Sequence, residues 1–265
     1  MPLSPLLQAY DHVLLDLDGC VWVGSAPTPH VREALSELRV GGKRIAFVSN
    51  GCRIAPEDYV SKLWSIGLQA SLEEVVTVGS ALQYVLADRR PGTPTFVIGS
   101  KAVHRHVADA GQRIVNWTDR AESAAVVVVA GHDDFTFAEL RTATRAVLAG
   151  AEMITAGRDR TFPDDDGIVP GTGAIVAALE YATQRTATSV GKPEPVLFET
   201  ALDRLGPGRA LMVGDRLDSD LRGAAAAGID AAIVLTGVTT PEQAQAAVDP
   251  APVAVADNLY ELVTG

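Results

Sequence analysis

The chain of 265 residues has little of what marks several protein classes. Its two cysteines, Cys20 and Cys52, are too few for a disulfide framework, and no apolar stretch resembling a signal peptide follows Met1. The longest apolar run, residues 124–130, is far shorter than the ~20 residues that span a bilayer. Positive charge is also scarce, since 22 Lys and Arg stand against 33 Asp and Glu. We therefore expect a cytoplasmic protein that binds neither membranes nor nucleic acid.

Its apolar content of 47% is enough for a hydrophobic core. The sequence shows no repeats or low-complexity tracts. Short β-branched runs alternate with longer helical patterns, which is typical of βαβ units and a parallel sheet. Near the N-terminus this alternation of strand and helix patterns covers residues 12–80. The glycines at 41, 42 and 67 are expected to end its first two helices. Near the C-terminus the alternation returns over residues 188–237, beginning with an expected strand in 188–194.

A separate set of strands and helices lies between these ends. Its expected strands are at residues 93–99, 124–131 and 152–157, and its helices at 136–150 and 171–185. About a hundred residues are enough for an inserted domain. We predict an α/β protein with a Rossmann-like core at 1–80 and 186–265 and an α/β cap at 81–185. Within the cap, Asp164–Asp166 are expected to form a solvated acidic turn, and His104 and His106 to be exposed rather than a metal pair.

Four polar motifs occur where strands of the predicted core should end. In an open parallel sheet, ligands bind outside the carboxyl ends of the strands, so these motifs should converge there. They are Asp16 and Asp18 in "DLDG", Ser49 and Asn50 in "FVSN", Lys192 in "GKPEP", and Asp215 and Asp220 in "GDRLDSD".

Asp16, Asp18 and Asp215 gathered near one point would repel one another strongly unless a cation accompanied them. Mg²⁺ prefers oxygen ligands and is typically held by one or two carboxylates plus substrate phosphate. Lys192 and Ser49 would then bind the oxygens of a phosphoryl group. One aspartate could attack phosphorus, and the other could act as general acid and base.

Together the four motifs resemble those of the haloacid dehalogenase superfamily. Their order and the size of the insert are similar to its phosphatases with a large α/β cap, the nitrophenylphosphatase, NagD-type and phosphoglycolate or glycerol-phosphate phosphatase group. The resemblance covers nearly the whole chain. It implies Mg²⁺-dependent hydrolysis of small phosphate monoesters through an aspartyl phosphate.

By that resemblance, Asp16 is the nucleophile, and Asp18 protonates the leaving alcohol and then activates water. Ser49, Asn50, Gly51 and Lys192 bind the phosphoryl group. Asp16, the backbone carbonyl of Asp18, and Asp215 hold Mg²⁺, and Asp220 supports them without being a ligand.

The cap departs from the family pattern. Where relatives carry Thr-Asn-Pro-Asp, this chain has Ala156, Gly157, Arg158 and Asp159, so only the aspartate matches. Arg158 and Asp159 are candidate substrate contacts, although Arg158 could equally pair with neighbouring aspartates. Gly51 and Cys52 also replace a second Asn and a Ser of relatives, and Cys20 and Cys52 are expected to be small, partly buried fillers.

Several alternatives remain open at this point. A phosphotransferase or mutase would use the same motifs, whereas a dehalogenase would need neither Asp18 nor a metal. A non-catalytic binding protein should have lost at least one of the motif residues, and a dinucleotide-binding protein should have a Gly-x-Gly-x-x-Gly after its first strand. The expected partner is a small phosphorylated metabolite, such as a sugar phosphate, glycerol phosphate, phosphoglycolate or nucleoside monophosphate, and a homodimer formed through the cap is a further expectation.

Overall fold

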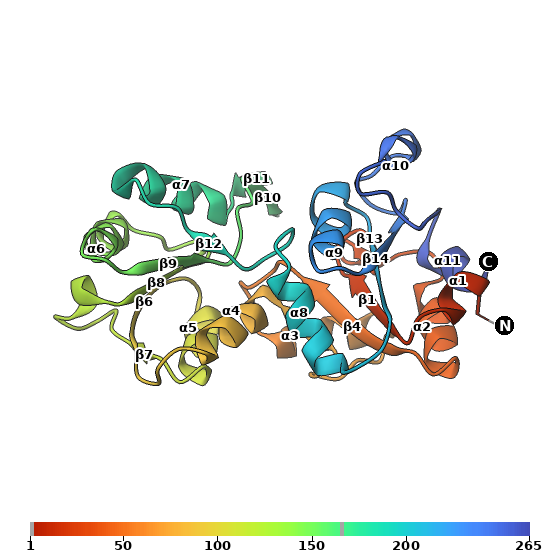
Figure 1. Cartoon of the computed structure of the whole chain (residues 1–265), viewed down its shortest axis with the longest axis horizontal. Coiled ribbons are helices and arrows are strands. Elements are labelled where there is room, and N and C mark those ends of the chain that lie inside the picture. The colour runs from red at the N-terminus through yellow and green to blue at the C-terminus, as the bar shows by residue number, and fades with distance from the viewer. Residues whose placement is uncertain (1–2, 165–166) are drawn as a thin grey trace. The chain divides into compact units, whose positions relative to one another are not determined.

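The computed structural model describes residues 3–164 and 167–265, and it divides into two compact units (Figure 1). The first unit comprises Met1–Ser49, Pro56–Thr77 and Lys192–Gly265, and the second comprises Asn50–Ala55 and Val78–Gly191. These limits differ from the predicted ones by a few residues at each boundary. They also assign the six residues Asn50–Ala55, expected in the core, to the second unit.

A six-stranded parallel sheet forms the centre of the first unit. The all-apolar runs of its central strands are buried on both faces, which is what parallel sheets require. In spatial order the strands are β15 (Ala254–Ala256), β14 (Asp230–Val234), β13 (Ala210–Gly214), β1 (His12–Asp16), β4 (Arg44–Ser49) and β5 (Val75–Thr77).

Helices cover both faces of this sheet. Val13, Leu15 and Phe47 point into a core shared with α2, α3 and α11, while α8 packs on β4 and β5 from the other face. Gly42 and Gly67, at φ of 73° and 80°, follow α2 and α3, as expected for residues that end helices. The helices are α1 (Pro5–Gln8), α2 (Val31–Val40), α3 (Pro56–Ser65), α8 (Val196–Leu205), α9 (Arg222–Ala226), α10 (Pro241–Ala246) and α11 (Leu259–Thr264).

The second unit has its own five-stranded parallel sheet. Its spatial order is β12 (Thr188–Ser189), β9 (Glu152–Thr155), β8 (Val126–Val129), β6 (Pro94–Ile98) and β7 (Arg113–Ile114). The strand expected within 188–194 is therefore not part of the core sheet, because Thr188 and Ser189 pair with β9. That part of the prediction was wrong.

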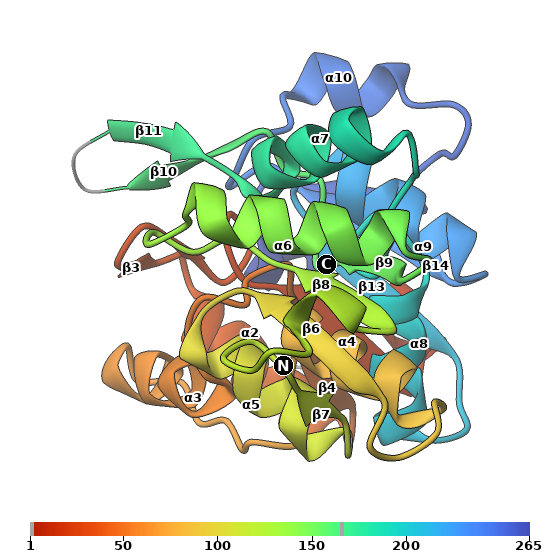
Figure 2. The ribbon, with the colours of Figure 1, turned by 90° about the vertical axis from the view of Figure 1, so that its left-hand side faces the viewer.

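Over the described residues, four α-helices, the 3-10 helix Ala121–Ser123 and a hairpin complete the second unit. Phe96, Val127 and Val129 face α6 (Phe137–Leu148) and α7 (Thr172–Thr183), which lie side by side in Figure 2. α4 (Val78–Ala87) and α5 (Lys101–Asp109) pack together in the same unit. β10 (Thr161–Asp164) and β11 (Gly167–Pro170) form an antiparallel hairpin, and the expected acidic turn lies partly outside the described residues, at 165–166.

His106 corrects another expectation. It is buried, its Nδ1 lies 3.2 Å from the side-chain oxygen of Gln83, and its ring packs against Gly79 of α4. Over the described ranges, the structure contains no helix of the length and apolarity that crossing a membrane requires.

Candidate active site

The carboxyl ends of three neighbouring strands carry the first set of predicted residues. Asp16 is the last residue of β1, Ser49 is the last of β4, and Asp215 follows β13 directly. Because β1 lies between β13 and β4, the topology brings these residues to one edge of the sheet. Asp16, Ser49 and Asp215 are all buried.

Lys192 is the centre of the charge cluster at this edge. Its Nζ donates to Oδ1 of Asp16 and, at 2.7 Å, to Oδ1 of Asp220. The lysine side chain is only 4% exposed, so both ion pairs are shielded from solvent. Charge-assisted hydrogen bonds in such surroundings are strong and fix the position of the cation.

The second carboxylate oxygen of Asp220 also has a hydrogen-bond partner. Asp220 lies in the π-helical turn Leu217–Leu221, and its Oδ2 accepts a hydrogen bond of 3.1 Å from the backbone N–H of Arg216. A Cβ at Gly214 would collide with its side chain, so the glycine at the end of β13 makes room for it. With both oxygens engaged, Asp220 orients Lys192.

Asp215 has one satisfied and one unsatisfied oxygen. Oδ2 accepts a 2.7 Å hydrogen bond from the backbone N–H of Val238, whereas the buried Oδ1 has no hydrogen-bond partner among residues 3–164 and 167–265. Glycines surround this carboxylate, because a Cβ at Gly19 or Gly237 would collide with it. Gly19 also has a φ of 94°, a conformation that other residues rarely adopt.

The electrostatics of the cluster show a shortage of positive charge. Burial raises the pKa of Asp16 to about 8, against the opposing charge of Lys192. Burial also raises the pKa of Asp215, against the hydrogen bond from Val238. For Lys192, burial alone would lower the pKa, but the charges of Asp16 and Asp220 raise it above its usual value.

A divalent cation fits this arrangement. Oxygens of Asp16, Asp215 and Asp220 lie within 4.8 Å of one another, and all three residues are buried. The donors are all oxygen, which suits a hard cation such as Mg²⁺. The unsatisfied Oδ1 of Asp215 is a free coordination position, so the residues present match the expected metal.

Asp18 differs from its neighbours in being exposed. Its Oδ1 accepts a 2.7 Å hydrogen bond from Nε1 of Trp22, and the backbone N–H of Gly19 donates to the Trp22 carbonyl at 2.7 Å. The tight turn after β1 therefore places a buried indole under the carboxylate. A role for Trp22 was not predicted from the sequence. A tryptophan four residues after Asp18, in "DGCVW", could have indicated one, because a buried indole N–H usually finds a hydrogen-bond partner.

The loop after β14 was also missed. Val238 donates to Asp215, and Thr236 Oγ1 donates to the carbonyl of Gly19 at 2.5 Å. The glycine of "LTGVT", directly after a strand, was the available signal for a close backbone approach.

The expected phosphate-binding residues after β4 fall in both units. Ser49 belongs to the first unit, whereas Asn50 and Gly51 belong to the second, where Asn50 packs against Gly191. Cys52 is buried in the second unit and Cys20 in the first. Burial raises the pKa of the Cys52 thiol to about 12 and that of Cys20 well above its usual value, which keeps both thiols protonated.

The cap candidates behave differently from each other. The Arg158 guanidinium forms two hydrogen bonds with Glu180, at 3.2 and 2.8 Å, and a third with the carbonyl of Ala187 at 2.8 Å. Arg158 thus joins α7 to the chain before β12. Asp159 is exposed, and its backbone carbonyl accepts a hydrogen bond from Gly173.

Comparisons with known proteins agree with this geometry. A model of the haloacid dehalogenase-like hydrolases matches residues 13–113, and a second HAD-hydrolase-like model matches residues 189–262. The chain is 37% identical over 240 residues to a D-glycerol 3-phosphate phosphatase of Mycobacterium tuberculosis, covering 90% of this chain and 66% of that protein. It therefore spans just under two thirds of that relative.

Other relatives are covered almost completely. An acid sugar phosphatase of Staphylococcus aureus is 31% identical over 241 residues, which is 90% of this chain and 92% of the relative. Among solved structures, a p-nitrophenyl phosphatase from Archaeoglobus fulgidus superposes with a TM-score of 0.87 at 31% identity, over 96% of this chain and 98% of that one.

The M. tuberculosis glycerol phosphate phosphatase in complex with magnesium gives a TM-score of 0.90 at 34% identity, over 98% of this chain and 78% of that one. Similarity of this extent, in sequence and in structure, establishes the family. The chain belongs to the haloacid dehalogenase-like hydrolases, in the group that contains these phosphatases.

Proposed function

We propose that this chain hydrolyses small phosphate monoesters in the cytoplasm, with Mg²⁺ as cofactor and Asp16 as the nucleophile. The observation that carries the proposal is the buried carboxylate of Asp16 between the ammonium group of Lys192 and the half-satisfied carboxylate of Asp215. Such a site attracts a cation and a phosphoryl group together.

The first chemical step uses Asp16 and Asp18. A carboxylate oxygen of Asp16 attacks phosphorus, the bond to the ester oxygen breaks, and that oxygen takes a proton from Asp18. Since the indole of Trp22 occupies Oδ1 of Asp18, the proton is carried on Oδ2. The products are the free alcohol and a phosphoryl group bonded to Asp16.

The second step reverses these roles. Water attacks phosphorus, its proton passes to Asp18, and the bond between phosphorus and Asp16 breaks. Inorganic phosphate leaves and Asp16 is again a free carboxylate. Lys192, held by Asp220, faces the nucleophile throughout and binds phosphoryl oxygens together with Ser49, Asn50 and Gly51.

Asp16, Asp215 and the backbone carbonyl of Asp18 would hold Mg²⁺, which when bound neutralises charge on the phosphoryl oxygens. Asp220 has its two oxygens engaged by Lys192 and the Arg216 N–H, so it supports the site from outside the metal's ligands.

Glycerol phosphate is the first substrate to test, because the relative of highest identity described above is a D-glycerol 3-phosphate phosphatase. Sugar phosphates, phosphoglycolate and nucleoside monophosphates belong to the same chemical class. We include Asp159 as a substrate contact, and a homodimer through the second unit as the assembly.

Phosphate release tests this function. A panel of monoesters that includes p-nitrophenyl phosphate is assayed with Mg²⁺ and with EDTA, beside Asp16→Asn. Release that needs Mg²⁺ and disappears in the variant is expected. If phosphate moved to another hydroxyl of the substrate without release, the chain would be a mutase instead.

A further inference from the structure

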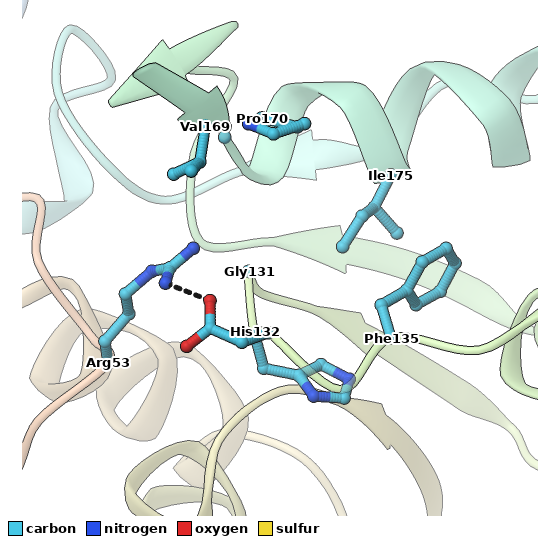
Figure 3. Close-up of a pocket in the computed structure, with 9 residues that line it drawn as sticks. Arg53, Gly131, His132, Phe135, Val169, Pro170 and Ile175 are labelled. Atoms are coloured by element: carbon cyan, nitrogen blue, oxygen red, sulfur yellow. Dashed lines mark hydrogen bonds and ion pairs between the residues drawn. The ribbon is translucent and has the colours of Figure 1, made fainter. Parts of the chain in front are cut away.

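A cavity of about 420 Å³ lies within the second unit (Figure 3). Residues after β8, the start of α7 and the loop 50–55 form its wall. Its volume lies within the range of roughly 300–1,000 Å³ that small-molecule sites occupy. The described residues that line it all belong to the second unit.

The topology of the second unit favours a ligand at this place. When its strands are numbered by their order in the sequence, their order in space from β7 to β12 is 2-1-3-4-5. This is the strand order of a small doubly wound sheet. Such sheets bind ligands at the carboxyl ends of the strands, where the strand order reverses. Here that point lies between β6 and β8, and Gly131, His132 and Asp133 of the cavity wall follow β8 after one intervening residue, Ala130.

The loop Asn50–Ala55 reaches the same point. Ser100, which follows β6, donates from Oγ to the Cys52 carbonyl at 3.3 Å. The next residue, Arg53, donates to Oδ1 of Asp133 at 2.5 Å. The loop thus supplies a guanidinium to the edge of the sheet at the reversal of strand order.

The pair between Arg53 and Asp133 is easily exchanged. Asp133 is 81% exposed while Arg53 is 32% exposed, so the carboxylate can swing into solvent and the guanidinium remains in the wall. Exposed ion pairs contribute little stability, commonly below ~1 kcal/mol. A ligand carboxylate can therefore take the place of Asp133 at small cost.

The remaining wall is apolar on one side. In Figure 3, Phe135 and Ile175 lie across the space from Arg53, and Val169 and Pro170 lie above it. His132 stacks edge-on against Phe135, and its Nε2 lies 3.2 Å from Glu139, whose side chain also caps α6 at Thr136. A ligand that carries a carboxylate on an apolar body would match the Arg53 side and the apolar side of this cavity.

The charges select a carboxylate over a phosphate. Among the described residues that form the wall, Arg53 is the single Arg or Lys, and Asp133 lies beside it. A phosphate with two negative charges would have only the single positive charge of Arg53 to balance it, with the carboxylate of Asp133 close by. A ligand carboxylate has one negative charge, the same as the Asp133 side chain that it would replace.

We infer that this cavity is a binding site for a small carboxylate carried on an apolar or aromatic body. Its carboxylate binds Arg53 in place of Asp133, and its body packs on Phe135 and Ile175. The inference does not rest on the proposed hydrolysis, because its test measures ligand binding and not phosphate release.

Benzoate and its neutral isostere benzamide are the probes, titrated into the whole chain and followed by ligand-observed NMR. Mg²⁺ and inorganic phosphate are present so that Lys192 is not the site of capture. We expect benzoate to bind in the millimolar range and benzamide about tenfold more weakly, the factor that a charge-assisted hydrogen bond contributes.

Asp133→Asn is the decisive variant, because it removes the competing carboxylate. It should tighten benzoate binding about threefold and leave benzamide unchanged, a modest effect in line with an exposed pair. Asp134→Asn, at the neighbouring exposed aspartate outside the wall, is the matched control and should change neither.

Two further variants locate the ligand. Arg53→Gln should weaken benzoate alone, while Phe135→Ala should weaken both probes and Phe137→Ala, at an exposed phenylalanine outside the wall, neither. Equal binding of the two probes to the wild-type chain overturns the inference. So does an Asp133→Asn titration that matches Asp134→Asn, even if Arg53→Gln fails to fold.

Discussion

Asp220 holds Lys192 at 2.7 Å while its second carboxylate oxygen accepts the backbone N–H of Arg216. This ties the lysine, which enters from the chain before α8, to the turn after β13. The relationship makes Asp220 a positioning residue, whose charge keeps the ammonium group of Lys192 directed at the edge where Asp16 ends β1.

Replacing Asp220 by Asn should lower kcat/KM for phosphate release by about 10- to 100-fold, the loss typical of residues that orient a site. The shape of the side chain is kept, while its charge and one of its two acceptor oxygens are lost. Asp218→Asn is the matched control, since Asp218 is exposed and pairs with Arg216. Equal activities of the two variants would show that Lys192 needs no anchor.

Gly19→Ala should destabilise the fold and remove the activity. The added Cβ meets the Asp215 carboxylate, and the φ of 94° is itself unfavourable for alanine. Gly24→Ala separates the two effects, because Gly24 has a φ of 61° and nothing within 4 Å of a Cβ. We expect Gly24→Ala to cost ~1 kcal/mol in thermal unfolding with activity retained. A Gly19→Ala variant with normal activity would contradict the close approach.

Trp22→Phe should lower kcat about tenfold and leave KM unchanged. It removes the N–H that orients Asp18, a hydrogen bond worth up to ~1.5 kcal/mol, and keeps an aromatic ring. Trp64→Phe is the control, since the indole of that exposed tryptophan donates to the Ala70 carbonyl. A rise in KM alone would instead assign Trp22 to substrate binding.

Mg²⁺ should raise the melting temperature of the wild-type chain, because three buried carboxylates lie close together and Lys192 pairs with only two of them, Asp16 and Asp220. In EDTA, Asp215→Asn should melt about 2–4 °C above wild type, since it removes one of the like charges. It should also lose the stabilisation by Mg²⁺. If Mg²⁺ stabilised wild type and variant equally, Asp215 would not be a ligand.

Arg158→Gln tests the cap residue that sequence reasoning placed near substrate. With its guanidinium bonded to Glu180 and the Ala187 carbonyl, we expect a melting temperature about 2–4 °C lower and an unchanged KM for every member of the panel. Glu180→Gln should behave alike. A change in KM confined to anionic leaving groups would restore Arg158 to the substrate site.

The sequence predicted the parallel α/β core and the strand ends that carry Asp16, Ser49 and Asp215, because strongly apolar runs followed by polar residues are local signals. Which sheet a short strand joins is not a local property. Thr188 and Ser189 lie next to Lys192 in sequence yet pair with β9, since that edge of the second sheet offers them hydrogen bonds.

Side-chain partners were harder to predict than positions. The Glu180 that engages Arg158 lies 22 residues further along the chain, on α7. Burial of His106 depends on Gly79, which leaves room for an imidazole ring between two helices. In each case the deciding residue is far away in sequence and has an unremarkable type, so composition and spacing gave no warning.

The assignment of Asn50–Ala55 to the second unit, with Ser49 and Pro56 in the first, has a consequence for protein engineering. Transplanting the cap of a relative as one continuous block, 78–191, would leave behind six residues that pack with it, Arg53 among them. A functional chimera would have to exchange both segments together. Natural recombination would face the same demand, which ties the sequence of the loop after β4 to that of a region beginning more than twenty residues later.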